Sequence, residues 1–223
     1  NALQQRAVLP ILKGRDVVVH SPSGSGKRVA FCLGALQTVV PSTREPQVLI
    51  LAPARELAEQ SQNLCLALGD SLNIQVHCCA GGKPVSDQIS TLESGVHIVC
   101  GAHGRVLQMI QQQHFNTQSV KMLVLDVAPE MWNTGLTEHV YDIYRYLPPP
   151  TQVVLVSATM PPEVLEMTQK LMTRPLWAVV NHARALKPIK PFFMAVESEQ
   201  DHAVSTTPQP TPRPFASTTT SKT

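Results

Sequence analysis

Residues 16–28 read DVVVHSPSGSGKR, a β-branched run followed by a glycine-rich turn and the start of a helical pattern. Glycines let successive backbone N–H groups face one anion, and the N-terminus of the following helix adds its dipole. Lys27 would reach the outer phosphates of a nucleotide as a point charge. The stretch therefore predicts a phosphate-binding loop at Ser21–Lys27, although a plain Gly/Ser turn between a strand and a helix remains the alternative. The predicted nucleotide contacts in and beside this loop are Ser23, Gly24, Ser25, Gly26, Lys27 and Arg28.

Position 28 departs from the usual pattern of such a loop. The residue after the lysine is ordinarily Ser or Thr, whose hydroxyl ligates Mg²⁺, whereas Arg28 offers donors and no acceptor. A second magnesium contact normally comes from an acid at the end of a nearby strand, and Asp126 closes such a strand. We predict that Arg28 and Asp126 form an ion pair where the metal would lie, so that Mg²⁺ binds weakly or not at all.

Short β-branched runs alternate with segments of helical periodicity along the first part of the chain. The predicted strands are 16–20, 47–52, 74–79, 97–101, 121–126, 152–157 and 176–181. The predicted helices are 27–40, 55–71, 85–92, 104–112, 130–147 and 162–172, and the N-terminus also has a helical pattern. Strand–helix alternation with strands that are apolar on both faces predicts an α/β fold, a parallel sheet covered by helices on both sides. Trp177, in the last run, is expected to be a core or lid residue.

Composition narrows the class of protein without naming a partner. The chain has 223 residues, of which 43% are hydrophobic, and no apolar run reaches the length of a membrane span. A net charge of +2 permits contact with nucleic acid but does not indicate it. The five cysteines lack the spacing of a zinc site or a disulfide framework, which favours a reducing compartment. We expect one main domain at 1–184, a connecting segment at 185–200 and a disordered Ser/Thr/Pro-rich tail at 201–223.

Several further motifs occur in a fixed order. They are Leu3-Gln4-Gln5-Arg6, Pro53-Ala54-Arg55-Glu56-Leu57-Ala58, Gly81-Gly82, Ala102-His103-Gly104-Arg105, Asp126-Val127-Ala128-Pro129 and Ser157-Ala158-Thr159. From Ala2 to about Glu197 the chain resembles the first RecA-like domain of a DEAD-box RNA helicase, an ATP-binding P-loop NTPase domain. Within that family it is most similar to the initiation-factor-4A group. The stretches 13–16 and 141–148 most resemble the member found in the exon junction complex.

The resemblance implies roles for individual residues. It implies ATP as the nucleotide, with Gln4 reading the adenine, and it implies that Ser157 and Thr159 link hydrolysis to a second domain. The residues that would contact single-stranded RNA are Pro53, Arg55, Glu56, Gly81, Gly82, Gly104 and Arg105. The family has threonine at the positions of Ala54 and Ala102 and proline at that of His103. We therefore expect RNA binding to be weaker than in the family.

The motif that names the family, Asp-Glu-Ala-Asp, is altered here. Asp126 is kept as a catalytic and metal-binding candidate, but Val127 stands where the glutamate that activates the attacking water belongs, and Pro129 replaces the second acid. Loss of a well-placed general base lowers a rate by about 10²–10⁴-fold. Residues 188–197 resemble the linker and first strand of a second RecA domain, after which the resemblance ends. These features predict impaired or absent ATP hydrolysis and unwinding.

Three functions follow from these observations. The first is a helicase-like domain that binds nucleotide and RNA but hydrolyses ATP poorly or not at all. The second is an active ATP-dependent RNA helicase in mRNA processing or translation, and the third is a non-enzymatic decoy or a degenerate gene product. The resemblance implies single-stranded RNA, bound weakly, and exon-junction or translation-initiation proteins as partners. It also implies an intracellular location, in the nucleus or the cytoplasm.

Overall fold

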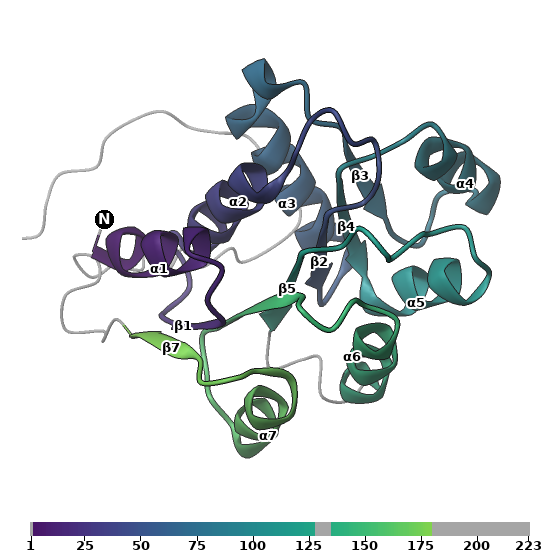
Figure 1. The fold of residues 1–223 in the computed structure, drawn as a ribbon. Helices are drawn as coiled ribbons and strands as arrows, with labels where there is room; N and C mark the ends of the chain where they lie inside the picture. Colours follow the sequence, from purple (N-terminus) through teal and green to yellow (C-terminus); the bar gives the residue numbers. More distant parts are fainter. Residues whose placement is uncertain (1, 128–134, 180–223) are drawn as a thin grey trace, which may run out of the picture. The chain divides into compact units, whose positions relative to one another are not determined.

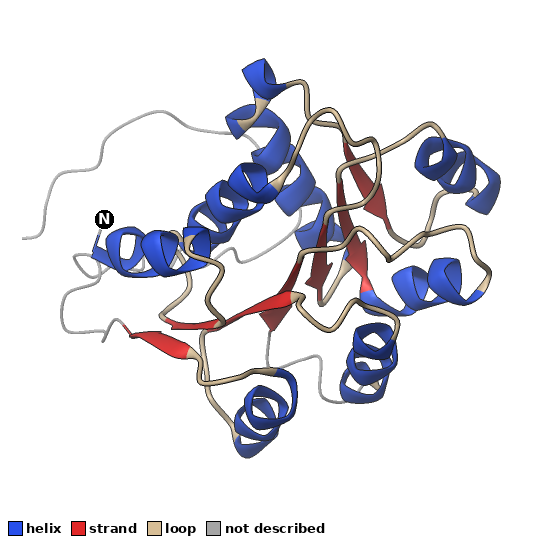
Figure 2. Cartoon of the chain, viewed as in Figure 1, coloured by secondary structure: helices blue, strands red, loops and turns tan. Residues whose placement is uncertain are grey.

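A computed structural model describes residues 2–127 and 135–179. Within these ranges seven parallel strands form one sheet in the order β3-β4-β2-β5-β6-β1-β7 (Figures 1 and 2). The strands are β1 (Val17–His20), β2 (Val48–Ala52), β3 (Val76–Cys79), β4 (Ile98–Ala102), β5 (Met122–Val127), β6 (Gln152–Ser157) and β7 (Leu176–Val179). The predicted parallel α/β sheet is therefore confirmed.

Helices cover both faces of this sheet (Figure 1). They are α1 (Ala2–Leu12), α2 (Lys27–Thr38), α3 (Arg55–Leu68), α4 (Val85–Glu93), α5 (His103–Gln111), α6 (Leu136–Arg145) and α7 (Pro162–Leu171). Buried residues of α1, α2 and α3 belong to one core cluster, and those of α4, α5, α6 and α7 belong to the other. Strands β2 and β6 lie between two apolar layers, and all of their residues are buried.

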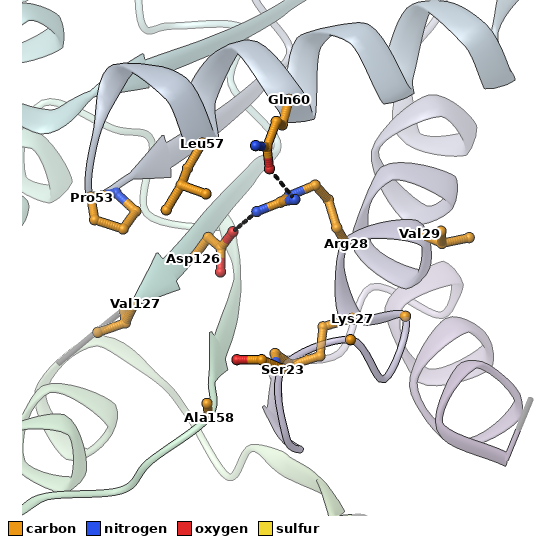
Figure 3. A pocket seen from close by; sticks show the side chains of 12 residues that line it. Ser23, Lys27, Arg28, Val29, Pro53, Leu57, Gln60, Asp126, Val127 and Ala158 are labelled. Atoms are coloured by element: carbon orange, nitrogen blue, oxygen red, sulfur yellow. Dashed lines mark hydrogen bonds and ion pairs between the residues drawn. The ribbon is translucent and has the colours of Figure 1, made fainter. Parts of the chain in front are cut away.

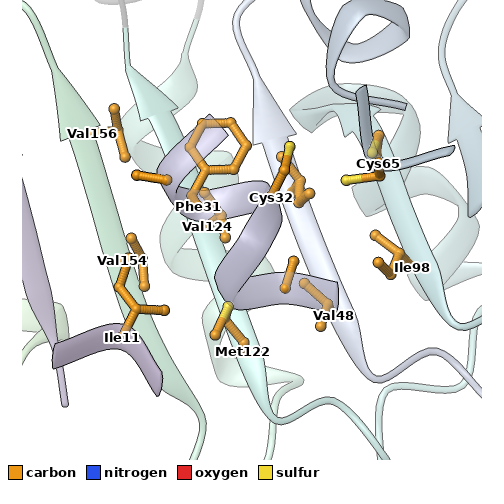
Figure 4. Packing of buried hydrophobic residues seen from close by; sticks show 14 of the residues in the cluster. Ile11, Phe31, Cys32, Val48, Cys65, Ile98, Met122, Val124, Val154 and Val156 are labelled. Atoms are coloured by element: carbon orange, nitrogen blue, oxygen red, sulfur yellow. The ribbon is translucent and has the colours of Figure 1, made fainter. Parts of the chain in front are cut away.

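Strand β5 shows how the sheet directs side chains to one layer or the other. Met122 and Val124 pack in the cluster beneath α2 and α3, where Figure 4 shows Val124 near Phe31, whereas Leu123 and Leu125 pack in the opposite cluster. Successive side chains of a strand alternate between faces. By the same alternation Asp126 faces α2 and α3, and the side chain of Val127 belongs to the opposite cluster.

The predicted elements differ from the observed ones mainly at their ends. The helix expected at 55–71 stops at Leu68, because the chain turns at Gly69 into the short 3₁₀ segment Asp70–Leu72. A Cβ at Gly69 would lie 2.8 Å from Leu36 Cδ2, so close packing on α2 requires glycine there. The strand expected at 74–79 begins at Val76. Residues 130–134 of the helix expected at 130–147, and residues 180–181 of the last strand, lie outside the described ranges.

Trp177 corrects one expectation from the sequence. Its side chain is 49% exposed, so it is not a core residue. The reason is that β7 pairs with β1 alone and forms an edge of the sheet. The segments predicted at 185–200 and 201–223 lie outside the described residues, so the predicted domain boundaries stay predictions. Across residues 2–127 and 135–179, none of the helices has the length and apolar character needed to cross a membrane.

Candidate nucleotide-binding site

The glycine-rich loop connects the end of β1 to the start of α2, as the sequence predicts. Gly24 and Gly26 have φ values of +76° and +89°, a left-handed conformation that side chains other than glycine rarely adopt. Gly26 is the N-cap of α2, and Lys27 is the first helical residue. The first N–H groups of α2 thus follow directly on the loop, an arrangement that favours binding of an anion.

The loop borders a cavity of roughly 560 Å³ at the carboxyl ends of the strands (Figure 3). Its lining comes from the loop, from α2 and α3, and from the ends of β5 and β6. The lining residues are Ser23, Gly24, Gly26, Lys27, Arg28, Val29, Pro53, Leu57, Gln60, Asp126, Val127 and Ala158. Ligands of open α/β sheets bind at this edge. Pro53, which the sequence predicts as an RNA contact, is one of the residues that line this cavity.

Lys27 is folded back onto its own loop. Its Nζ donates hydrogen bonds to the backbone oxygens of Ser21, at 2.5 Å, and Pro22, at 2.7 Å. Burial lowers the pKa of Lys27; the Asp126 carboxylate opposes this shift, and the Arg28 guanidinium adds to it. The ammonium therefore loses part of its hydration, and in exchange it donates to two neutral carbonyl oxygens. A polyphosphate would offer it a stronger, charged acceptor.

The predicted ion pair between Arg28 and Asp126 is present (Figure 3). Arg28 Nη2 lies 3.4 Å from Asp126 Oδ2, and Arg28 Nη1 donates to Gln60 Oε1 at 2.8 Å. Burial raises the pKa of Asp126, while Arg28 and Lys27 together oppose that shift. Gln60 on α3 was not among the predicted site residues; its place could be inferred only by knowing how α3 is rotated against α2.

The residues expected to support hydrolysis lie at the ends of β5 and β6. Val127 pairs with Ser157 in the sheet register and is only 5% exposed, in the core cluster on the side opposite α2. Ser157 Oγ donates to the backbone oxygen of Thr159 at 2.6 Å and accepts from the Thr159 N–H at 3.3 Å. The Ser-Ala-Thr segment is therefore a closed turn at the edge of the cavity, with Ala158 lining it.

A second group of predicted residues, at the start of α3, is held together by Arg55. Its Nε donates to Glu59 Oε1 at 2.9 Å, and its Nη1 donates to the backbone oxygen of Gly81 at 3.2 Å. A Cβ at Gly82 would lie 2.2 Å from Arg55 Nη1, and Gly82 has a φ of +81°. The positive φ favours glycine at this position, and a Cβ there would also displace the end of the Arg55 side chain. Glu56, also predicted here, is exposed in the first turn of α3.

The start of α5 carries the third group. Gly104 and Arg105 follow His103, whose Nδ1 lies 2.8 Å from Nδ1 of His139 on α6. Burial lowers the pKa of His103, and the neighbouring His139 lowers it further. Arg105 Nη1 is buried without a hydrogen-bond partner in the described part of the chain. The pairing with His139 was not predicted, because no periodicity relates residues on two separate helices.

Helices α3 and α5 begin at alanine N-caps. Ala54 and Ala102 have no side-chain acceptor, so the backbone N–H groups at both helix starts receive no hydrogen bond from the N-cap side chain. Strands β2 and β4, which lead into these helices, are neighbours in the sheet, so the two helix starts lie at one edge. Such N-termini favour phosphate oxygens.

The residues of the site suit the two ligands considered above, a nucleotide and Mg²⁺, to different degrees. The loop, its left-handed glycines and Lys27 fit a nucleotide polyphosphate. For magnesium, the residue after the lysine offers no ligand, because Arg28 has no acceptor, and the Asp126 carboxylate is paired with it. Gln4 lies in the first turn of α1 and is not among the residues lining the cavity.

Comparison with known proteins connects these features to one family. A family model described as DEAD/DEAH box helicase matches residues 1–168. The chain is 51% identical over 201 residues to the ATP-dependent RNA helicase FAL1 of Mycosarcoma maydis, covering 90% of this chain and 51% of that protein. It is 51% identical over 200 residues to eukaryotic initiation factor 4A of Dictyostelium discoideum, covering 89% and 49%.

Solved structures agree with this assignment. A Dbp5 variant from S. cerevisiae, bound to Nup159, a Gle1 variant, IP6 and ADP, superposes with a TM-score of 0.69 at 30% identity. The match covers 80% of this chain and 48% of that one. The chain thus spans about half the length of the curated relatives it matches.

Proposed function

The chain belongs to the DEAD/DEAH box helicase family, and from that premise we propose that it binds a nucleotide and single-stranded RNA but hydrolyses ATP poorly or not at all. The observation that carries the proposal is the cavity beside the glycine-rich loop. It holds Lys27 at the start of α2, which suits a polyphosphate, together with Arg28 and Val127, which do not suit hydrolysis. ATP is the proposed nucleotide, with Gln4 as the adenine contact, and Mg²⁺ is expected to bind weakly or not at all.

We propose that hydrolysis lacks a well-placed general base among the described residues that line this cavity. The valine at position 127 has no proton acceptor, and its side chain belongs to the apolar core. Asp126 is the nearest carboxylate that lines the cavity, but its ion pair with Arg28 directs it toward α2. Loss of such a base typically lowers a rate by about 10²–10⁴-fold. Ser157 and Thr159 are the proposed link between hydrolysis and a second domain. We propose Asp126 as a metal ligand only for a variant that lacks Arg28, because Arg28 pairs with the Asp126 carboxylate.

RNA binding is proposed at the starts of α3 and α5. Arg55 and Arg105 supply charge there, Gly81, Gly82 and Gly104 allow close approach, and the helix N-termini supply uncapped donors. The alanine caps and His103 remove groups that the family uses, so we propose weak binding. Exon-junction or translation-initiation proteins are the proposed partners, in the nucleus or the cytoplasm; the similarity to initiation factor 4A supports the second of these partner classes.

An active ATP-dependent RNA helicase is the competing function, and the 51% identity to a relative with that name, FAL1 of Mycosarcoma maydis, favours it. A non-enzymatic decoy is the other alternative. ATP turnover with and without single-stranded RNA separates the first two. We expect no RNA-stimulated turnover; stimulated turnover that disappears in Lys27→Ala would establish an active enzyme instead. Thermal unfolding with added ATP or ADP tests the decoy, because a ligand that binds the folded state must stabilise it.

Restoring the altered positions gives a positive test of the hydrolysis defect. The triple variant Arg28→Thr, Val127→Glu and Pro129→Asp returns the hydroxyl and both acids of the family pattern. If these positions cause the defect, this variant gains turnover over the wild type by about 10²-fold or more. A matched triple with Val127→Gln in place of Val127→Glu keeps the shape without a carboxylate and should gain none. Equal turnover by the two triples would contradict the assignment of position 127.

A further inference from the structure

The guanidinium of Arg28 is held on two sides at the edge of the nucleotide cavity. Asp126 Oδ2 lies 3.4 Å from Nη2, and Gln60 Oε1 accepts from Nη1 at 2.8 Å. The contacts come from β5 and α3, while Arg28 itself stands on α2 directly after Lys27 (Figure 3). The guanidinium, carried by α2, is thus positioned by contacts from two further elements at the edge of the cavity.

This cation remains able to bind a further anion. Its side chain is 30% exposed, and it lines the cavity together with Lys27 and the loop residues Ser23, Gly24 and Gly26. A guanidinium has more N–H donors than the two contacts with Asp126 and Gln60 use. Arginine also binds phosphate oxygens in a planar, two-point geometry. A polyphosphate lying on the loop would therefore meet two adjacent cations, Lys27 and Arg28.

Among the described residues that line the cavity, none offers a divalent ion a comparable place. Arg28 contributes no acceptor, and the oxygen of Asp126 that faces the cavity cation is already paired. An ion bound to the phosphates near Asp126 would be a like charge within a few ångströms of the guanidinium, which is unfavourable in a partly desolvated site. A magnesium chelate of a nucleotide bound beside Lys27 would therefore bring a second cation close to the Arg28 guanidinium.

We propose that this site binds nucleoside di- and triphosphates in their metal-free form, with the Arg28 guanidinium replacing the divalent ion, so that magnesium weakens binding instead of strengthening it. The proposal rests on the proposed nucleotide binding and specifies its ligand. It also assigns Arg28 a selective role: it distinguishes the free polyphosphate from its chelate, whereas Lys27 attracts both.

The test is a calorimetric titration of the full chain with ADP, in excess EDTA and in excess MgCl₂ at matched ionic strength. For the wild type, we expect the apparent Kd to rise by about threefold or more with magnesium, since the chelate is rejected. For Arg28→Thr, we expect the opposite sign, with tighter binding in magnesium. Arg28→Lys keeps the charge and should retain the wild-type sign with lower affinity.

Arg44→Thr is the matched control, because it removes the same charge from an exposed residue ahead of β2, away from the cavity. It should behave as the wild type does, and thermal unfolding should show every variant to be folded. Wild-type binding that is unchanged or strengthened by magnesium overturns the metal-free proposal and leaves nucleotide binding intact. Absence of ADP binding by the wild type in both buffers overturns the proposed nucleotide function itself.

Discussion

Gly82→Ala tests the arrangement proposed for the RNA-binding edge. The substitution adds a Cβ at a residue with φ of +81°, and that atom would lie 2.2 Å from Arg55 Nη1. The neighbouring Gly81 offers a matched control, because a Cβ there meets nothing within 4 Å. The two variants differ by one position and carry the same added methyl group, so a difference between them reports conformation and contact.

The expected cost has two parts. An alanine in the left-handed region is disfavoured by about 1–2 kcal/mol. Displacing Arg55 also breaks its hydrogen bond to the Gly81 oxygen, which at a side chain 39% exposed contributes about 0.5–1.5 kcal/mol. The free energy of unfolding of Gly82→Ala should fall by about 1.5–3.5 kcal/mol in all, whereas Gly81→Ala should change it by about 0.5 kcal/mol or less.

Urea unfolding measures both variants, and a double-mutant cycle separates the two parts. In an Arg55→Ala background there is no guanidinium to displace, so Gly82→Ala should cost only the backbone strain; the coupling should be about 0.5–1.5 kcal/mol. Anisotropy of a labelled single-stranded RNA at fixed salt should show weaker binding by Gly82→Ala than by Gly81→Ala. Equal stability losses in the two single variants, or no coupling with Arg55, would refute this reasoning.

Three further substitutions test other contacts. Gly34→Ala would place a Cβ 2.3 Å from Ile11 Cγ2 between α1 and α2, and we expect a loss of about 1–3 kcal/mol in urea unfolding that Ile11→Ala partly relieves. Burial and His139 depress the pKa of His103, so below about pH 6.5 the unfolded chain binds more protons than the folded chain. The free energy of unfolding should therefore decrease as the pH is lowered, and it should decrease less in His103→Gln. Asp16→Ala removes the acceptor of two backbone N–H groups, at 2.8 Å and 2.7 Å, which should cost about 2–4 kcal/mol in urea unfolding.

Controls for these substitutions come from the same chain. Gly104→Ala adds a Cβ at an ordinary 3.9 Å from His139 and should not destabilise as Gly34→Ala does. His114→Gln removes a histidine outside the His103 pair and should keep the wild-type slope of stability against pH. A wild-type slope in His103→Gln, or a loss in Gly104→Ala as large as in Gly34→Ala, would count against the contacts described.

The features that the sequence predicted are those that depend on residues close together in the chain. The loop at Ser21–Lys27 and the strand ending at Asp126 were recognisable because glycine spacing and apolar runs are local patterns. The ion pair between Arg28 and Asp126 joins residues 98 positions apart. It was nevertheless predictable, since both residues occupy positions that a phosphate-binding loop and its partner strand bring together.

What depends on how helices are rotated against each other was not predictable. Gln60 meets Arg28 because α3 packs beside α2 on one face of the sheet, and His139 meets His103 because α6 packs beside α5. Helical periodicity marks the buried side of each helix but does not say which residue of a neighbouring helix it will face. The hydrogen bonds from Lys27 to the carbonyl oxygens of its own loop likewise depend on the conformation of the loop. The spacing of glycines in the sequence does not specify that conformation.

Asp126 and Val127 show why the alterations in and around the motif 126–129 affect ligand binding and ATP hydrolysis separately. The two residues are adjacent in β5, so their side chains leave the sheet on opposite faces: Asp126 faces Arg28 on α2, and Val127 packs in the core with α5, α6 and α7. Removing Arg28 therefore frees the aspartate without changing the environment of position 127. Val127 also lines the cavity, so a glutamate at 127 is expected to extend into the cavity, because a buried unpaired carboxylate is costly. Repair of the binding site and repair of hydrolysis are thus distinct structural steps, and the first does not imply the second.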